Sequence, residues 1–225
     1  MTLQDRLDAL KADFEGGRAS FRPGPEVIDM MHRATAELIA SGQALNAKKA
    51  GDKAPGFTLK DPDGHAVSSA ELQARGPLVI SFYRGVWCPY CNLELQALQA
   101  ALPQIEARGA SVIAISPQTG SNSRKSQRDN KLTFPILGDE KSRVAAAFGL
   151  RFSLPDYLVE LYKGFKNDLP AFNDDPAWVL PMPARYVIGI DGIIAYGEVN
   201  PDYTQRPDPS ELLPVLDKLH RPAAA

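Results

Sequence analysis

The only two cysteines of this 225-residue chain constrain its fold more than any other feature, because they form the motif Cys88-Pro89-Tyr90-Cys91. An apolar run, residues 78–83, precedes the motif, and an amphipathic stretch, residues 93–98, follows it. This order predicts a buried strand, a short loop and a helix, with both thiols in the first helical turn. Residues three apart share one helix face, so the two sulfur atoms can meet. The unpaired N–H groups and the positive dipole end of a helix N-terminus favour thiolate over thiol, and the motif therefore predicts a redox site.

Two other interpretations of the cysteine pair have to be weighed. A structural zinc ion needs four ligands, but the chain has no further cysteine. Its histidines are scattered without ligand spacing, at His32, His65 and His220. Two buried, unreactive cysteines are the second alternative. Arg84 and Trp87 before the pair, with Pro89 at the first helical position, are more typical of a loop that presents a reactive group. We therefore expect no metal, and no cofactor other than the Cys88–Cys91 dithiol.

The composition and charge exclude several classes of protein. Lys and Arg number 25 against 27 Asp and Glu, so the formal net charge of −2 gives no reason to expect nucleic acid or an anionic membrane as a partner. No apolar stretch approaches the roughly 20 residues that span a bilayer, and the charged N-terminus lacks the apolar core of a signal peptide. Two cysteines are too few for a disulfide-stapled secreted scaffold. These features predict a cytoplasmic protein.

Strands and helices are predicted to alternate after residue 50. Buried strands are expected at residues 78–83 and 112–115, with a shorter one at 134–137 and helices between them. A hairpin with the turn Asp191-Gly192 follows near residues 185–196. The alternation predicts an α/β domain built from βαβ units around a mostly parallel sheet. Reactive groups in such sheets gather beyond the carboxyl ends of the strands, which is where the cysteine motif falls.

Two segments lie outside this alternation. Residues 1–48 are predicted to form an N-terminal helical extension whose apolar stripes pack on the domain of residues 49–225 or form the interface of a homodimer. Residues 151–182 form an insertion with an apolar patch, which either covers the site or makes a satellite packing cluster. The sequence leaves both pairs of alternatives open.

Five separated segments resemble the alkyl hydroperoxide reductase/thiol-specific antioxidant family. They are residues 51–59 with the turn Asp63-Gly64, residues 81–83 leading to Trp87-Cys88-Pro89, residues 112–116, residues 134–149, and residues 186–192. The resemblance implies a thioredoxin-like fold, with a central mixed β-sheet flanked by helices. It also implies that Cys88 is the peroxidatic cysteine.

The chain departs from this family around the cysteine. Family members carry Thr or Ser three residues before the peroxidatic cysteine and Pro seven before it, where this chain has Gly85 and Ser81. The family's catalytic arginine aligns with Pro183, and Arg185 lies two residues beyond. Pro183 resembles the cis-proline that faces the C-x-x-C motif of thioredoxins, so we expect a cis peptide bond before it, close to the thiols. The resemblance is thus to a peroxiredoxin scaffold with a dithiol site of thioredoxin type.

Two enzymatic functions follow from this resemblance. In the first, Cys88 attacks a hydroperoxide and becomes a sulfenic acid, Cys91 resolves it as a disulfide, and a thioredoxin or glutathione system reduces that disulfide. Arg84, with Arg185 as a second candidate, would replace the missing threonine and arginine by stabilising the thiolate. In the second, the pair exchanges electrons with protein or small-molecule disulfides through a mixed disulfide on Cys88. A non-enzymatic binding module is a third alternative, and it requires both cysteines to be dispensable.

The predicted site therefore consists of two catalytic cysteines and a supporting set. We expect Cys88, at the start of the helix, to be the exposed nucleophile, with Cys91 one turn further in. The supporting residues are Arg84, Trp87, Pro89, Pro183 and Arg185.

Overall fold

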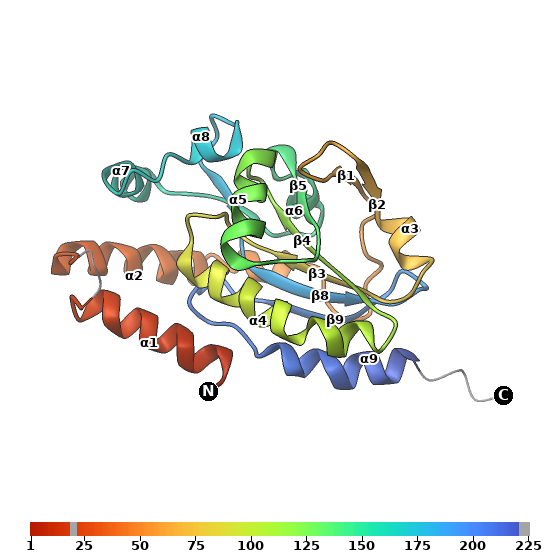
Figure 1. Cartoon of the computed structure of the whole chain (residues 1–225). Coiled ribbons are helices and arrows are strands. Elements are labelled where there is room, and N and C mark those ends of the chain that lie inside the picture. Colours follow the sequence, from red (N-terminus) through yellow and green to blue (C-terminus); the bar gives the residue numbers. More distant parts are fainter. Residues whose placement is uncertain (19–21, 221–225) are drawn as a thin grey trace.

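A seven-stranded mixed sheet forms the centre of the computed structural model, which describes residues 1–18 and 22–220 (Figure 1). The strand order is β2-β1-β5-β4-β3-β8-β9, and a separate two-stranded sheet contains β6 and β7. The strands are β1 Thr58–Lys60, β2 Ala66–Ser68, β3 Leu78–Phe82, β4 Ser111–Ser116, β5 Ile136–Gly138, β6 Arg151–Ser153, β7 Val179–Pro181, β8 Ala184–Ile188 and β9 Ile194–Val199.

Helices cover both faces of the large sheet. The α-helices are α1 Leu3–Glu15, α2 Pro25–Ala40, α3 Ser69–Gln73, α4 Pro89–Glu106, α5 Gly120–Asn130, α6 Arg143–Ala147, α7 Asp156–Gly164, α8 Leu169–Asn173 and α9 Leu212–His220. Three short 3₁₀ helices are η1 Gln43–Asn46, η2 Glu140–Ser142 and η3 Pro209–Glu211. In Figure 1, α1, α4 and α9 lie along one side of the sheet, and Leu7, Leu95 and Leu216 bring these helices into one buried cluster. A second cluster, which includes Phe148 just after α6, fills the opposite face.

The mixed sheet is confirmed, but the expectation of a mostly parallel sheet is wrong. Strand β4 pairs in parallel with β3 and with β5, whereas the other four ladders of the large sheet are antiparallel. Helix α4 connects β3 to β4 and helix α5 connects β4 to β5, and these helical crossovers give the two parallel pairs. Short turns join β1 to β2 and β8 to β9 and make them antiparallel neighbours, and β1 and β8 also run antiparallel to β5 and β3.

The N-terminal helix α1 packs on the main domain. It begins with a capping box, in which the Thr2 hydroxyl accepts the Asp5 N–H and the Asp5 carboxylate accepts the Thr2 N–H. Leu3 and Leu7 are fully buried in the cluster beneath α4. The Gln4 side chain accepts the Arg206 N–H at 2.8 Å, so α1 also holds the C-terminal loop. The division of the chain at residues 48 and 49 into two domains, and the homodimer, stay predictions.

The insertion forms its own packed unit. Strands β6 and β7 pair antiparallel, and α7 and α8 lie between them in the chain. Its core consists of Leu154, Leu158, Tyr162, Leu169 and Leu180, with Trp87 packed against it. Of the two alternatives for the insertion, the satellite packing cluster is therefore present. Its contact with Trp87 also connects it to the loop before the cysteines.

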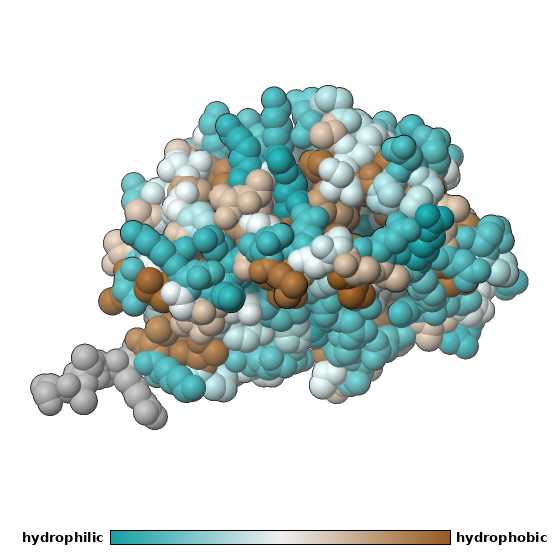
Figure 2. Space-filling model, turned by 180° about the vertical axis from the view of Figure 1, so that it is seen from behind, coloured by the Kyte–Doolittle hydropathy of each residue, from teal (hydrophilic) through white to brown (hydrophobic). Residues whose placement is uncertain are grey.

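The surface is mostly hydrophilic on the face seen in Figure 2, where hydrophobic spots are separated by polar side chains. Large apolar side chains that are well exposed include Ile39, Leu45 and Ile190. Among the described residues, none of the helices is both long enough and apolar enough to cross a membrane.

Replacing Leu7 with Ala tests the packing of α1. Because Leu7 is completely buried, we expect Leu7→Ala to lower the free energy of unfolding by about 2–5 kcal/mol, the usual cost of such a core truncation. Urea denaturation measures this loss. The matched control is Leu45→Ala, since Leu45 is 87% exposed and its truncation should change stability little. Equal stabilities of the two variants would show that α1 is not part of the core.

Candidate active site

The two cysteines lie in the strand–loop–helix unit that the sequence predicts. Strand β3 is buried along its whole length between β4 and β8, and it ends six residues before Cys88. Cys88 is the N-cap of α4, with Pro89 at the first helical position. Its sulfur accepts the Cys91 N–H at 3.4 Å, and the Cys91 thiol donates to the same sulfur at 2.8 Å. The structure thus places the two sulfur atoms together at a helix N-terminus, as expected from their spacing.

The expectation that Cys88 is exposed is wrong. Cys88 is 1% exposed and Cys91 is completely buried. Cys88 lies in the wall of a cavity of about 140 Å³, whose other walls come from α1, α2, α7 and the loop after β9. These distant segments close over the helix start, and local sequence does not reveal them. Because Cys88 lines this cavity, the cavity offers a small molecule a route to the sulfur.

A buried polar network fixes the loop before Cys88. The Gln118 side-chain oxygen accepts the Val86 N–H at 2.8 Å, and its amide nitrogen donates to the Tyr83 hydroxyl at 2.6 Å. On the other side, the Asn92 amide donates to the Val86 carbonyl at 2.9 Å. Both polar groups of Val86 are therefore satisfied inside the protein, which holds the thiol at a fixed place. Gln118 directly follows Ser116-Pro117 at the end of β4, and no sequence motif identifies it as a residue of the site.

Gly85 explains why the family's hydroxyl is missing. Its φ of +149° is a conformation that side-chain-bearing residues rarely adopt. A Cβ atom on Gly85 would also lie 2.6 Å from the indole nitrogen of Trp87. Threonine at this position would thus require both a new backbone conformation and a shift of Trp87.

Arg84 lies buried among aromatic rings beside the thiols. Its guanidinium carbon lies 4.3 Å from the ring centre of Tyr203 and 4.8 Å from that of Trp87, and it donates to the Tyr162 hydroxyl. Such rings attract a cation through their negative faces. Trp87 and Tyr162 in turn pack edge to face, with centroids 5.6 Å apart. The insertion, through Tyr162, therefore takes part in the site as well as forming its own cluster.

A second guanidinium comes from the loop after β9. Arg206 is 3% exposed and pairs with the Glu94 carboxylate at 2.7 Å. Arg185 of β8 binds the other oxygen of Glu94 at 2.9 Å and donates to the Pro207 carbonyl. Sequence reasoning missed both Glu94 and Arg206. Arg185, which it named, is placed by these contacts as a support for Glu94.

The electrostatics separate the two thiols. Burial by itself raises the pKa of Cys88, but the Cys91 thiol hydrogen bond, the Arg84 charge, the Cys91 N–H and the Arg206 charge together hold that pKa below its ordinary value. Burial raises the pKa of Cys91 well above its ordinary value, and the hydrogen bond to Cys88 and the negative charge on Cys88 add to this rise. These effects favour the thiolate on Cys88 and the protonated thiol on Cys91.

The predicted cis bond before Pro183 is wrong, because the Met182–Pro183 peptide bond is trans. The Met182 N–H donates to the Leu150 carbonyl, and the chain passes from β7 directly into β8. This continuous extended path contains no tight turn of the kind that holds a cis-proline. Pro183 is buried and shares a small cavity with Arg84 and Tyr203, so it supports the wall behind Arg84.

Among the residues that the structure describes, one group of side chains has the composition of a metal site. Asp61, Asp63 and His65 bring their ligand atoms within 4.8 Å of one another in the β1–β2 turn. His65 already pairs with Asp61 at 3.0 Å, and Asp61 accepts N–H groups of the turn. These hydrogen bonds account for the cluster as part of the turn.

Comparison with known sequences identifies relatives over part of the chain. The AhpC/TSA family matches residues 50–197. Chloroplastic peroxiredoxin Q of Oryza sativa subsp. japonica is 34% identical over 100 residues, which cover 44% of this chain and 46% of that protein. Peroxiredoxin Bcp of Escherichia coli (strain K12) is 31% identical over 106 residues, which cover 47% of this chain and 67% of that protein. The match to the rice protein thus spans about half of its length.

The fold also recurs among solved structures. The crystal structure of peroxidoxin BcpB from Mycobacterium tuberculosis superposes with a TM-score of 0.60 at 21% identity, covering 76% of this chain and 97% of that one. This likeness confirms the predicted thioredoxin-like fold. Helices α1 and α2 precede the residues that match the family.

Replacing Arg206 with Gln tests its effect on the thiolate. Because the Arg206 charge lowers the pKa of Cys88, we expect Arg206→Gln to raise the midpoint at which thiolate absorbance at 240 nm appears. In the wild type this midpoint should lie below the roughly 8.5 of free cysteine. Arg108→Gln is the control, since it removes an arginine that pairs with Asp217 at the surface. An unchanged midpoint in a folded Arg206→Gln protein would exclude the proposed contribution of Arg206.

Proposed function

The chain belongs to the AhpC/TSA family, and from this premise we propose that it is a thiol-dependent peroxidase in which Cys88 is the peroxidatic cysteine. The observation that carries the proposal is the combination of a lowered Cys88 pKa with nearly complete burial. A thiolate is the form that attacks a peroxide. A small hydroperoxide can reach the sulfur through the cavity, whereas a disulfide on the surface of a folded protein cannot without a movement of the covering segments.

The proposed reaction begins at the Cys88 thiolate. The thiolate attacks the terminal oxygen of the hydroperoxide, an S–O bond forms and the O–O bond breaks. The sulfur is oxidised by two electrons to a sulfenic acid, and the peroxide is reduced to an alkoxide or hydroxide, which leaves as alcohol or water after taking up a proton. The charges of Arg84 and Arg206, fixed in place before the reaction, favour both the thiolate and the negative charge that develops on the departing oxygen.

Cys91 is the proposed resolving cysteine. Its thiol lies 2.8 Å from the Cys88 sulfur, so the sulfurs need to approach by less than 1 Å to reach the roughly 2.05 Å of a disulfide. Attack of Cys91 on the sulfenic acid forms this disulfide and releases water. Both residues belong to one helical turn, and resolution therefore requires no unfolding of the helix.

Regeneration of the dithiol requires two electrons from an external thiol. We propose a thioredoxin or glutathione system as the reductant, and the reducing cytoplasm as the compartment that such recycling suits. A small thiol such as glutathione can use the cavity, whereas a protein reductant requires the covering segments to open.

Stopped-flow kinetics separates this proposal from disulfide exchange. We expect the reduced protein to react faster with hydrogen peroxide than with a glutathione mixed disulfide, because burial restricts access to Cys88 more for the larger reagent. Free cysteine measured under the same conditions is the reference. If the protein consumes peroxide no faster than free cysteine but exchanges rapidly with the mixed disulfide, the peroxidase proposal fails and thiol–disulfide oxidoreductase activity replaces it.

Single serine variants assign the two cysteines. Cys88→Ser should abolish reaction with peroxide, because the low-pKa thiol is gone. Cys91→Ser should still undergo the first oxidation and accumulate a sulfenic acid, because only the resolving thiol is missing. Mass spectrometry after one equivalent of peroxide measures both outcomes. Oxidation of the Cys88 variant together with an unmodified Cys91 variant would reverse the assignment.

A further inference from the structure

A row of polar side chains crosses three strands of the large sheet beneath α4. Ser81 of β3 lies directly opposite Arg185 of β8, and Arg185 lies directly opposite Glu198 of β9. Side chains that lie opposite each other on neighbouring strands share one face of a sheet. Because Arg185 binds Glu94 of α4, this is the face that α4 covers. The row therefore begins on β3, the strand that leads to Cys88.

Four polar atoms in this region are buried without a hydrogen-bond partner among the described residues. They are Ser81 Oγ, Arg185 Nε, Glu198 Oε2 and Arg206 Nη2. Arg206 belongs to the same region, because it binds the second carboxylate oxygen of Glu94. Buried polar groups are normally paired, and unpaired ones call for an internal water molecule or a functional role. The region therefore has unused capacity to bind a water molecule or a proton.

This polar region adjoins the two thiols. Cys88, Cys91 and Glu94 follow one another at intervals of three residues, so they lie on one side of α4. Burial raises the pKa values of both thiols, and the Arg206 charge opposes this rise in each of them. The same charge acts on Glu198. One cation is thus shared by the reactive thiols and by the Glu198 carboxyl.

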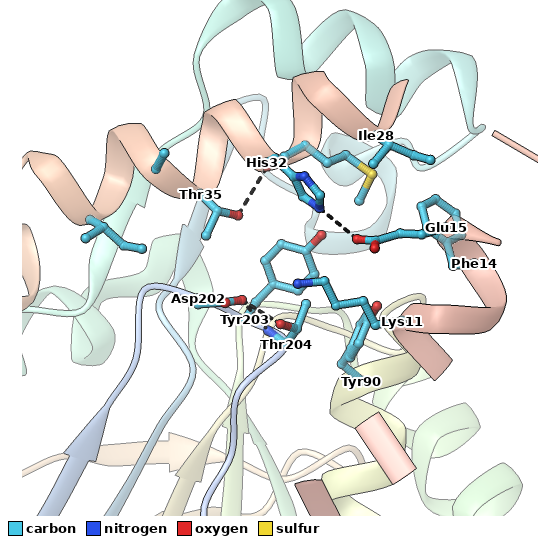
Figure 3. Close-up of a pocket in the computed structure, with 13 residues that line it drawn as sticks. Lys11, Phe14, Glu15, Ile28, His32, Thr35, Tyr90, Asp202, Tyr203 and Thr204 are labelled. Carbon is cyan, nitrogen blue, oxygen red and sulfur yellow. Dashed lines mark hydrogen bonds and ion pairs between the residues drawn. The ribbon is translucent and has the colours of Figure 1, made fainter. Parts of the chain in front are cut away.

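The loop after β9 keeps Arg206 in this position. Figure 3 shows Tyr203 and Thr204 of this loop facing an outer cavity of about 270 Å³ between α1 and α2. Tyr203 packs edge to face on Tyr90 of α4, with centroids 5.5 Å apart. Gln4 of α1 donates to the Thr204 carbonyl at 3.3 Å and accepts the Arg206 N–H at 2.8 Å. The loop is therefore held from two sides.

Glu198 connects the polar region to the surface, because it is only half-buried. The charged and titratable groups that interact with it are Glu94 of α4, Arg185 and Tyr186 of β8, Tyr196 of β9, Arg206 of the loop after β9 and Glu211 of η3. Burial raises the pKa of Glu198 to about 7, although the two arginines oppose this rise. Near neutral pH the carboxyl can therefore exchange its proton.

We propose that Glu198 exchanges a proton in step with the redox state of the thiols: it holds the proton while Cys88 is a thiolate, and releases it when oxidation removes that negative charge. Glu198 acts through Arg206, which makes it a positioning residue for the thiol chemistry. The inference rests on the oxidation of Cys88 in the proposed function, but it does not depend on which oxidant reacts.

Oxidation changes the balance of buried charge around the site. The charged side chains buried here include the cations Arg84, Arg185 and Arg206 and the carboxylate of Glu94. The Cys88 thiolate adds a second negative charge, which disappears when the sulfur is oxidised. An ionised Glu198 replaces it, because nearby cations favour the charged form of a carboxyl. Conversely, the thiolate disfavours ionisation of Glu198, because like charges repel.

The reaction balances with this proton. The Cys88 thiolate, the Cys91 thiol and neutral Glu198 react with hydrogen peroxide to give the disulfide, two water molecules and the Glu198 carboxylate. The sulfur pair loses two electrons, which the peroxide takes up as its O–O bond breaks, and the Glu198 proton neutralises the departing hydroxide. When two external thiols reduce the disulfide, the proton that is released as the Cys88 thiolate forms again returns to Glu198.

Proton uptake during a single oxidation tests this inference. The reduced protein is mixed with one equivalent of hydrogen peroxide at about pH 6.5, just below the Glu198 pKa of about 7, and an indicator dye in weak buffer records the uptake. We expect the wild type to take up fewer protons than Glu198→Gln, because the variant must take the whole proton from the buffer. The difference should be roughly half a proton per disulfide if oxidation lowers the Glu198 pKa by about one.

Controls separate proton exchange from a structural effect. Glu198→Asp keeps an ionisable group and should retain the wild-type uptake better than Glu198→Gln. Glu140→Gln removes a glutamate whose side chain is 80% exposed, and its uptake should equal that of the wild type. Thiolate absorbance at 240 nm should show the same Cys88 midpoint in Glu198→Gln, since glutamine resembles the neutral carboxyl. Infrared difference spectra of the wild type should lose a protonated carboxyl band on oxidation, which decides the question if Glu198→Gln does not fold.

The outcomes distinguish this inference from the proposed function. Equal proton uptake by the wild type and folded Glu198→Gln would overturn the inference, and so would a wild-type infrared spectrum in which oxidation removes no protonated carboxyl. Diamide, which oxidises dithiols without peroxide and requires the same proton, should give the same difference between the two proteins. If diamide gives this difference while hydrogen peroxide fails to oxidise the thiols, the peroxidase proposal is refuted and the role of Glu198 stands.

Discussion

Glu94 joins three parts of the molecule that are far apart in the sequence. From α4 its carboxylate pairs with Arg185 of β8 and with Arg206, which is 112 residues away, and all three side chains are buried. Removal of one partner from a buried ion pair costs about 3–5 kcal/mol, because it leaves an uncompensated charge in the interior. The thiol helix, the centre of the sheet and the loop after β9 are therefore fixed relative to one another, and the position of Arg206 near the thiols depends on this bridge.

The N-terminal helix α1 holds the same loop from outside. Gln4 accepts the Arg206 N–H, and the Leu3 N–H donates to Asp208 at 3.0 Å. A segment that precedes the family match thus supports a charge that lowers the pKa of Cys88, and it also supplies part of the cavity wall. The two cations that lower the pKa of Cys88 are Arg84, in the loop before it, and Arg206, in the loop after β9.

Interactions between residues close in sequence determine the strand–loop–helix unit of the thiols, so this unit could be predicted. The packing of distant segments around the thiols could not. The C-x-x-C spacing, Pro89 at the first helical position and the preceding apolar run act within one strand–loop–helix unit, and the structure reproduces that unit. The burial of Cys88 depends on α1, α2 and α7, which lie far away in sequence. Glu94 and Arg206 are equally ordinary in sequence, since only folding brings them together. The resemblance to thioredoxins implied a cis bond before Pro183, but that bond is trans, and β7 and β8 on either side of it belong to different sheets.

The two guanidinium groups near Cys88 have partners other than the two thiols. Arg84 contacts aromatic rings and the Tyr162 hydroxyl, and Arg206 pairs with Glu94. We expect these contacts to remain and to hold both charges in place when oxidation removes the negative charge of the thiolate. Because the cations need no rearrangement when the thiolate forms again, their stabilisation of it is present at the start of each turnover. Charges fixed in place before the reaction are the arrangement that contributes most to catalysis of the proposed kind.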